Sequence, residues 1–499
     1  MISAFTNTFR IPELRNRVLF TLAMLIVVRI GAAITCPGVN AAVIQTWFQS
    51  QVDNQSGGNV AALFNIFSGG ALENCAIFSL GVMPYISASI MMQLLTAVIP
   101  RLGKLAKEEG GRHKVMQYTR YVTILLCILQ GYMLARTFEN PANNPLLSGI
   151  AETIKNMGVN LVVNPGLPFE FMTVITLTAG TMFLMWIGDQ ITDRGIGNGM
   201  SLIISVGIAA RLPAALIQAW RTFVPSGGGG SQVNPLVLVV MIAFLVLVIA
   251  AVICVTQAQR KISVQYAKRV VGRKVYGGQT QYMPLKVNYA GVMPIIFAQA
   301  LLVFPSTILG QFRGAVWANN LAHALTSGFW HYLFYGGMIF FFSYFWVATQ
   351  FQPSQIADDL KKYGGYIPGI RPGRETATFL DNVMTRLTFA GAIFLTIIAI
   401  LPQMLSNYMG VPYIAAQFFG GTSLLIMVGV VLDTMRQIET HLIQRHYDGF
   451  LRKGRIRGRF DSPAGRGQAV QQDALLWLYV GIAILLLAAI TIFVAQHMK

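Results

Sequence analysis

Long apolar runs, separated by short polar and basic stretches, recur along the chain from residue 18 onward. A helix that crosses a membrane needs about 20 mostly apolar residues, because the hydrocarbon core is about 30 Å thick. On this criterion the pattern predicts eleven membrane spans. They are Val18–Ile34, Cys75–Ile99, Tyr118–Ala135, Phe171–Gly188, Met200–Trp220, Leu236–Val255, Gly291–Leu309, Trp330–Thr349, Leu387–Leu401, Phe418–Val431 and Ala474–Val494. The pattern therefore predicts an all-α polytopic membrane protein, folded as one integrated bundle.

The segment Leu63–Ile99 departs from this simple alternation. Its first apolar piece, Leu63–Leu72, is too short to span, and polar or glycine residues at 68–70 and 73–74 interrupt it before the full-length run Cys75–Ile99. Irregular backbone at membrane depth is tolerated only where it is buried in protein or lines a water-filled cavity. A short helix before a complete one therefore predicts a channel or transporter with a segment folded into its mouth.

The distribution of charged residues predicts how the bundle is oriented across the membrane. Charged residues make up 11% of the chain, whereas soluble domains average about 25%. The net charge is nevertheless +18, and the basic residues gather in alternate loops. These loops are Arg101–Arg120, Arg260–Lys286, Lys361–Arg386 and Arg436–Arg466. The positive-inside rule then predicts a multi-pass membrane protein with a cytoplasmic N-terminus. Contact with anionic lipids explains many of these charges, and a ribonucleoprotein or acidic partner remains an alternative for the two longest loops.

Enzyme and metal chemistry find little support in the sequence. There is no H-E-x-x-H, no G-x-S-x-G and no phosphate-binding loop. The cysteines and histidines lack metal-ligand spacing, so no metal or cofactor is predicted. Cys36 and Cys75 both fall near the predicted outer surface, which leaves a disulfide between them open.

Ion-coupled transporters usually bury ionisable residues near the membrane midplane. Here Arg29 is the clearest such residue within a span, and it lies near a helix end. A passive pore therefore fits better than a pump. A secondary transporter with inverted repeats is the alternative, and a membrane-embedded enzyme comes third.

Several motifs resemble a known family. IFSGGAL at 66–72 followed by GVMPYISASI at 81–90 resembles the plug and second helix of the SecY family of protein-translocation channels. Further matches follow in chain order: QYTRY at 117–121, GIGNG at 195–199, NYAGVMP at 288–294, PGIRPG at 368–373, MTRLT at 384–388 and GGTSLLI at 420–426. The matches are collinear over most of the chain, so a chance resemblance is not a serious competitor.

The resemblance implies a ten-helix bundle in two inverted halves. These are residues 1–225 with spans 1–5 and residues 232–436 with spans 6–10, followed by a basic cytoplasmic tail at 437–473. It implies the central channel subunit of a Sec protein translocase in the cytoplasmic (inner) membrane, which passes unfolded secretory proteins across that membrane and membrane proteins sideways into it. The implied partners are SecE and SecG in a heterotrimer, the SecA ATPase, the ribosome and preproteins with signal sequences, with YidC and the SecD/SecF complex as further candidates.

The resemblance also assigns roles to individual residues. The pore ring would be Ile86, Ile90, Met200, Ile204, Ile296 and Ile426. The plug, at 63–72, would include Leu63, Ile66, Phe67, Ser68, Gly69, Gly70 and Leu72. The lateral gate would contain Pro84, Gln93, Pro294 and Gln299. The surface that docks SecA or the ribosome would contain Arg269, Arg273, Lys274, Arg371 and Arg374.

Some of these roles carry a physical expectation of their own. Ile86 and Ile90 are one helical turn apart and share a face, although this spacing alone is more typical of ordinary packing. Pro84 and Pro294 each lack a backbone donor and are expected to disturb their helices. The two gate glutamines are expected either to pack or to hydrogen-bond across a closed seam. For the plug glycines, a hinge and close packing both remain open.

Two segments depart from the family pattern. Residues 474–494 form an additional apolar span beyond the point where the family usually ends. This extra transmembrane helix, within 474–499, is expected at the lipid-facing edge. The run SGGGGS at 226–231 has the composition of a flexible linker.

Overall fold

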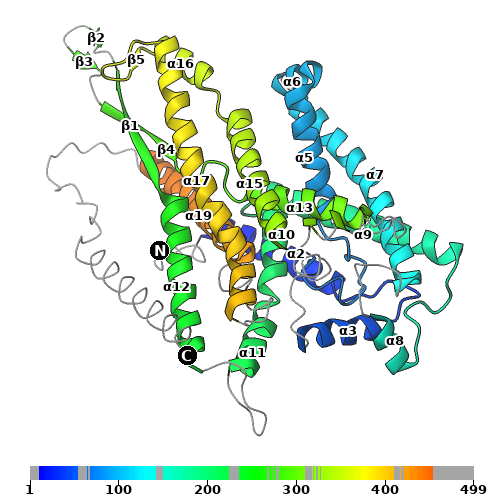
Figure 1. Cartoon of the computed structure of the whole chain (residues 1–499). Coiled ribbons are helices and arrows are strands. Elements are labelled where there is room, and N and C mark those ends of the chain that lie inside the picture. The colour runs from blue at the N-terminus through cyan, green and yellow to red at the C-terminus, as the bar shows by residue number, and fades with distance from the viewer. Residues whose placement is uncertain are drawn as a thin grey trace.

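The computed structural model describes residues 11–53, 65, 68–108, 110–141, 150–223, 235–266, 269–271, 274–276, 280–309, 317, 320–321, 324–325, 328–409, 416 and 421–452. Helices dominate these residues and run between two ends of the molecule (Figure 1). We call them the hairpin end, which carries strands β1–β5, and the cap end, which carries α3 and α8. Several predictions lie outside the described residues: Leu63, Ile66, Phe67, Arg273, the linker at 226–231 and the extra span at 474–494.

Every predicted span between residues 18 and 431 overlaps a helix. The helices up to residue 223 are α2 (Pro12–Gly31), α3 (Ala41–Asp53), α5 (Met83–Val98), α6 (Pro100–Lys107), α7 (Gly111–Glu139), α8 (Ile150–Met157), α9 (Leu167–Arg194), α10 (Gly199–Ala209) and α11 (Leu212–Phe223). Those that follow are α12 (Pro235–Gln257), α13 (Met293–Leu309), α15 (Gly328–Gln350), α16 (Pro353–Lys362), α17 (Arg374–Met409) and α19 (Thr422–Arg452). A helix satisfies its own backbone groups, which is what an apolar solvent requires.

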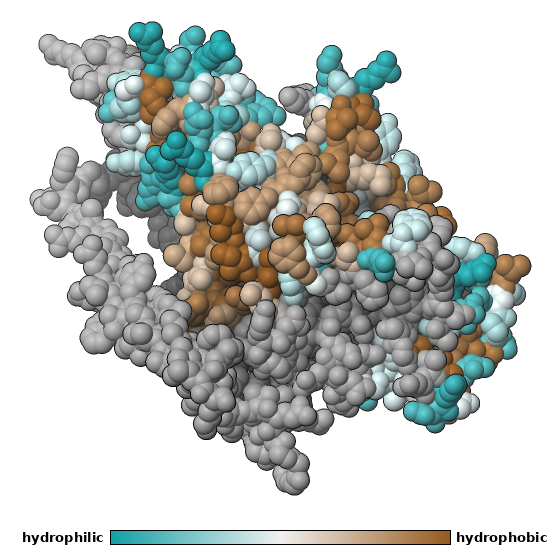
Figure 2. Space-filling view, in the orientation of Figure 1, coloured by the Kyte–Doolittle hydropathy of each residue, from teal (hydrophilic) through white to brown (hydrophobic). Residues whose placement is uncertain are grey.

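Several helices have the length and composition of membrane spans. Among the described residues, five helices are long and apolar enough to cross a membrane, or six if the bent pair α5–α6 counts as one span. Large apolar side chains also face outward, such as Leu125 at 66% and Phe171 at 71% exposure. Figure 2 shows hydrophobic surface over these helices and hydrophilic residues at the hairpin end. The fold is that of an all-α polytopic membrane protein.

The prediction of one complete helix over Cys75–Ile99 is wrong at its start. Residues 75–82 form turns, and α5 begins only at Met83. At the other end, Pro100 disfavours helical backbone at the residue before it, and Ile99 is extended with φ −94° and ψ 111°. The chain bends by 107° there and continues as α6. The second span is therefore shorter and more irregular than its apolar run.

A small β-sheet at the hairpin end was not predicted. β1 (Gln259–Tyr266) pairs antiparallel with β4 (Thr280–Lys286), and β5 (Gly365–Tyr366) pairs with the other edge of β1. β2 (Arg269–Val271) and β3 (Lys274–Tyr276) form a separate two-stranded ladder at the tip. The pairing of β1 with β5 joins two basic loops, about 100 residues apart in the chain, into one surface.

Three larger apolar clusters organise the described part of the interior. The main cluster lies among the long helices and includes residues of α2, α5, α9, α10, α12, α13, α15, α17 and α19. The cap cluster joins Trp47 of α3 and Ile150 of α8 to Leu72 and Cys75. The hairpin cluster packs Ile262 and Leu285 of the sheet on the helices below it. The segment 68–82 connects the first two, since Ala71 belongs to the main cluster and Leu72 to the cap cluster.

Candidate functional site: an apolar seal with a plug

The six predicted pore-ring residues all belong to the main cluster or pack against it. Ile86 and Ile90 come from α5, Met200 and Ile204 from α10, Ile296 from α13 and Ile426 from α19. The five isoleucines are between 2% and 7% exposed, and the partly buried Met200 packs against the cluster. Residues more than 300 positions apart in the chain thus belong to one buried apolar cluster. In general, an apolar constriction in a pore can exclude ions by dewetting without a charged filter.

Local geometry explains why Met200 faces this cluster. Asn198 caps α10 by accepting hydrogen bonds from the N–H groups of Met200 and Ser201, which fixes where the helix begins. On α9, a Cβ added at Gly188 would lie 2.7 Å from the Met200 sulfur. The absence of a side chain at Gly188 therefore makes room for the methionine. The motif at 195–199 is the tight interhelical turn that its glycines predict, with Gly197 at φ +87°.

Of the described plug residues, Asn65 is helical and residues 68–72 form turns. Ala71 is fully buried and Leu72 is 2% exposed. Gly69 has φ +66°, and a Cβ added there would lie 2.6 Å from the Cα of Gly207 on α10. Of the hinge role and the close-packing role left open for Gly69, the structure therefore shows close packing. The plug segment touches the helix that carries Met200 and Ile204.

The predicted gate helices α5 and α13 pack against each other, and α13 packs on α15. Pro84 and Pro294 are each the second residue of their helix, in the first turn, where a missing N–H is harmless. The expectation that they disturb their helices is wrong. Instead Pro305, which the sequence analysis did not single out, lies inside α13.

The two gate glutamines do not bond to each other in this structure. The Nε2 of Gln93 donates to Ser89 Oγ one turn away, at 3.2 Å. Gln299 is 9% exposed, and its Oε1 has no hydrogen-bond partner among the described residues. The cross-seam hydrogen bond is therefore not formed, and packing is the arrangement present.

The predicted docking residues lie at the hairpin end. Arg371 and Arg374 are exposed, and the Arg371 carbonyl accepts a hydrogen bond of 2.9 Å from Thr376 Oγ1. This bond ties the turn that carries Arg371 to the start of α17. Arg269 lies on β2 and Lys274 on β3, at the tip of the sheet. The sheet thus holds both sets of basic residues on one structural unit.

Cys36 and Cys75 lie opposite each other, with the Cys36 N–H donating to the Cys75 carbonyl at 2.7 Å. Both thiols are free and buried, so the disulfide that the sequence left open is not formed. Burial raises the pKa of the Cys75 thiol well above its usual range. Cys75 also has φ +45°, an uncommon backbone conformation for a residue with a side chain.

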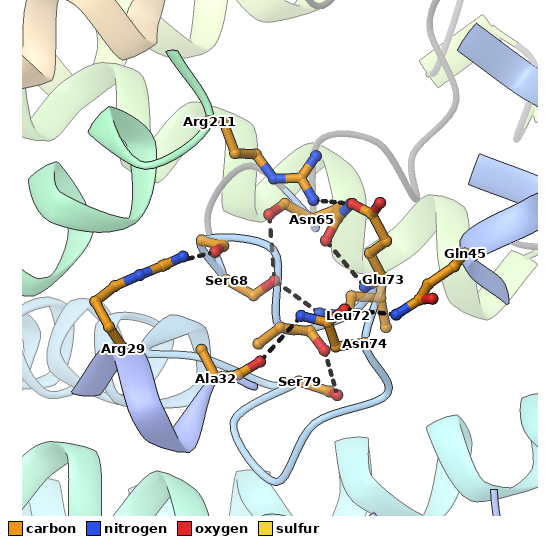
Figure 3. Close-up of polar contacts among 12 residues, drawn as sticks. Arg29, Ala32, Gln45, Asn65, Ser68, Leu72, Glu73, Asn74, Ser79 and Arg211 are labelled. Carbon is orange, nitrogen blue, oxygen red and sulfur yellow. Dashed lines mark hydrogen bonds and ion pairs between the residues drawn. The ribbon is translucent and has the colours of Figure 1, made fainter. Parts of the chain in front are cut away.

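The predicted site does not include a set of polar residues that surround the plug segment. Arg29 of α2 and Arg211, in the turn between α10 and α11, both contact the segment 68–73 (Figure 3). Their partners on that segment are the Gly69 carbonyl and the Glu73 carboxylate. A carboxylate in an otherwise apolar stretch was the available signal for this site.

Comparison with known proteins shows which family this chain resembles. The family model described as SecY matches residues 76–435. The chain belongs to the SecY family. It is 42% identical over 460 residues to the protein translocase subunit SecY of Thermotoga maritima, covering 92% of this chain and 100% of that one. It is 45% identical over 453 residues to the Escherichia coli K12 protein of the same name, covering 89% and 96%.

Solved structures support the same fold. The chain matches a structure titled as a protein-conducting channel with a TM-score of 0.58 at 17% identity, covering 87% of this chain and 93% of that one. It matches Sec61 in a canine ribosome–channel complex with a TM-score of 0.55 at 16% identity, covering 87% and 93%. At these low sequence identities the two solved structures support the fold alone. They agree with the helical architecture to which family membership points.

Proposed function

We propose that the cluster of six pore-ring residues is the closed seal of a protein-conducting channel. As a member of the SecY family, the chain is a channel subunit of a protein translocase, and the transporter alternative is not favoured. The observation that carries the seal is the convergence of Ile86, Ile204, Ile296 and Ile426 from four helices. Apolar side chains can close around a moving polypeptide without bonding to its side chains, and the flexible, polarizable Met200 adapts further.

Opening requires the seal to widen and the plug to leave it. Parting α5 from α13 opens a path toward lipid, and this seam holds no hydrogen bond between its two glutamines. An arriving apolar segment therefore competes with packing rather than with a polar lock. We infer a passive channel, driven by a partner motor or by the ribosome, and no catalytic role for its residues.

We further propose that the hairpin end faces the cytoplasm and docks the driving partner. Two of the four basic loops, Arg260–Lys286 and Lys361–Arg386, belong to this end, and the positive-inside rule assigns such loops to the cytoplasm. Arginine binds both carboxylates and RNA phosphates in a bidentate manner, which suits SecA and the ribosome alike. SecE and SecG would complete the heterotrimer, and anionic lipids would contact the same basic loops.

Site-specific crosslinking of a stalled export substrate tests the seal. A photo-crosslinking residue at position 86, 204 or 426 is expected to capture the substrate. Leu125, Phe171 and Ile397 are exposed on the outside of α7, α9 and α17 and provide matched control positions. Equal capture at both sets of positions, or none at the first set, would contradict the proposal.

Charge reversal tests docking. Arg371→Glu is expected to leave the protein inserted and folded but to reduce SecA-driven export by about tenfold or more, because reversal places like charges across the interface. Lys362→Glu is the control, since Lys362 is also exposed on the same unit. Unchanged preprotein export into reconstituted vesicles by the Arg371 variant would remove it from the docking surface.

A further inference from the structure

The plug segment is held at its turn by two arginines from outside it (Figure 3). Arg211, between α10 and α11, donates to Glu73 Oε2 in a close ion pair. Arg29, in the last turn of α2, donates through Nη1 to the Gly69 carbonyl at 2.8 Å. These contacts join residues 138 and 40 positions apart in the chain. The turn at Gly69 and Gly70 is therefore clasped between two different helical elements.

Glu73 is also fixed from within its own segment. Its backbone N–H donates to Asn65 Oδ1 at 3.1 Å, and Asn65 Nδ2 donates back to Glu73 Oε2 at 3.2 Å. Asn65 is fully buried, and its amide oxygen and nitrogen both bond to Glu73. The carboxylate thus accepts hydrogen bonds from both Arg211 and Asn65. Charge-assisted hydrogen bonds of this kind are the strong ones.

The degree of burial lets the ion pair work reversibly. The Arg211 and Glu73 side chains are 15% and 28% exposed, which is neither core nor open surface. A fully buried pair would leave two costly bare charges on separation, and a surface pair would hold almost nothing. At intermediate burial, water reaches each charge when the segment moves away. The pair favours the closed position and yet does not trap it.

We propose that the Arg211–Glu73 pair, aided by Arg29, is an electrostatic latch that sets how readily the plug leaves its closed position. This inference rests on the proposed channel function and adds the contact that regulates it. The apolar contacts of Ala71 and Leu72 also favour the closed position, but they tolerate small shifts. The ion pair has one geometry, so its rupture defines the opening step.

The latch is tested by recording single-channel openings of the idle protein in planar bilayers. Glu73→Gln keeps the shape of the side chain but removes its charge, and it is expected to raise the opening frequency about tenfold, which corresponds to about 1.4 kcal/mol. Glu73→Asp, which keeps the charge, is expected to stay closer to the wild type. Asp193→Asn removes an acidic charge from the last turn of α9 and is the control.

Charge exchange separates the latch from a packing role. Arg211→Glu alone is expected to open the idle channel as Glu73→Gln does, and combining it with Glu73→Arg is expected to restore closure at least in part. Wild-type opening in Glu73→Gln, or a double variant no more closed than Arg211→Glu, would overturn the latch. Arg211→Gln provides an independent test if a charge-reversed variant does not fold.

The outcome remains distinct from that of the channel proposal. Substrate crosslinks at positions 86, 204 and 426 together with unaltered opening in Glu73→Gln would reject the latch and leave the channel standing. A lack of crosslinks at those positions would reject the seal, and with it the basis of the latch.

Discussion

The proposed seal and the proposed plug are held by different kinds of contact. The seal is made of side chains on regular helices, and its contacts are apolar and non-directional. Residues 68–73 of the plug segment form turns, and they make directional hydrogen bonds and an ion pair with the residues around them. A non-directional contact can stretch around a moving chain, whereas a directional one is either made or broken. We therefore expect the proposed seal to deform gradually around a passing chain, and the plug contacts to break in one step.

The largest expected effect comes from breaking the seal itself. Ile86→Gly combined with Ile426→Gly removes two apolar side chains from the cluster, and the idle protein is expected to leak ions continuously. Ile393→Gly combined with Ile397→Gly makes the same chemical change on the exposed side of α17 and serves as the control. Conductance in planar bilayers measures the leak. A tight membrane in the first variant would show that the seal lies elsewhere.

A clash under the plug is expected to have the next largest effect. Gly69→Ala would place a Cβ 2.6 Å from the Gly207 Cα, in a backbone conformation that costs alanine about 1–2 kcal/mol even without a clash. Frequent openings are expected, because the segment cannot seat. Gly158→Ala shares the left-handed backbone, with φ +64° and open space around it, so it controls for strain alone. Equal opening in the two variants would argue against tight seating.

Native cysteines provide a test of plug movement without changing the plug. Cys75 is fully buried and its thiol pKa is raised by that burial, so alkylation is expected to be slow in the idle channel and faster during translocation. Cys127 on α7 is also fully buried and is expected to stay unreactive in both states. Mass spectrometry measures the alkylated fraction of each cysteine, and the ratio of Cys75 to Cys127 labelling is compared between the idle and the translocating channel. Unchanged labelling of Cys75 during active export would argue that the plug base does not move.

The smallest expected effects come from neutral hydrogen bonds around the same segment. Gln45 of α3 donates to Asn74 Oδ1 at 2.9 Å, and Gln45→Ala removes that contact. A neutral bond contributes about 0.5–1.5 kcal/mol, so opening is expected to rise less than in Glu73→Gln. Gln93→Ala removes a bond within α5 only and is expected to change little. An effect of Gln45→Ala larger than that of Glu73→Gln would contradict the electrostatic account.

The sequence predicted helices well where apolar runs were long and unbroken, as in α7, α9 and α17. It failed where the backbone leaves the helix inside an apolar run, as at residues 75–82, because hydropathy does not reveal local backbone shape. It also missed the sheet that joins β1 to β5. That sheet depends on pairing between segments about 100 residues apart, for which no local pattern exists.

Among the site residues, the apolar ones were easier to predict than the polar ones. Ile86 and Ile90 shared a helix face by spacing, and the family resemblance then supplied Met200, Ile204, Ile296 and Ile426. Glu73 was visible as an interruption, but neither Arg29 nor Arg211 pointed to it. The position of a charged residue in the sequence does not show which residue it pairs with.

The sequence by itself determined the membrane class, most helices, the basic loops and the family, because all of these depend on residues close together in the chain. Only the tertiary structure decided which helix faces meet at the seal, that the gate prolines begin helices rather than bend them, and that Arg211 pairs with Glu73. Those features require particular elements to pack at particular distances. The plug segment, an irregular stretch in the sequence, acquires its clasp only because α2 and the α10–α11 turn close around it.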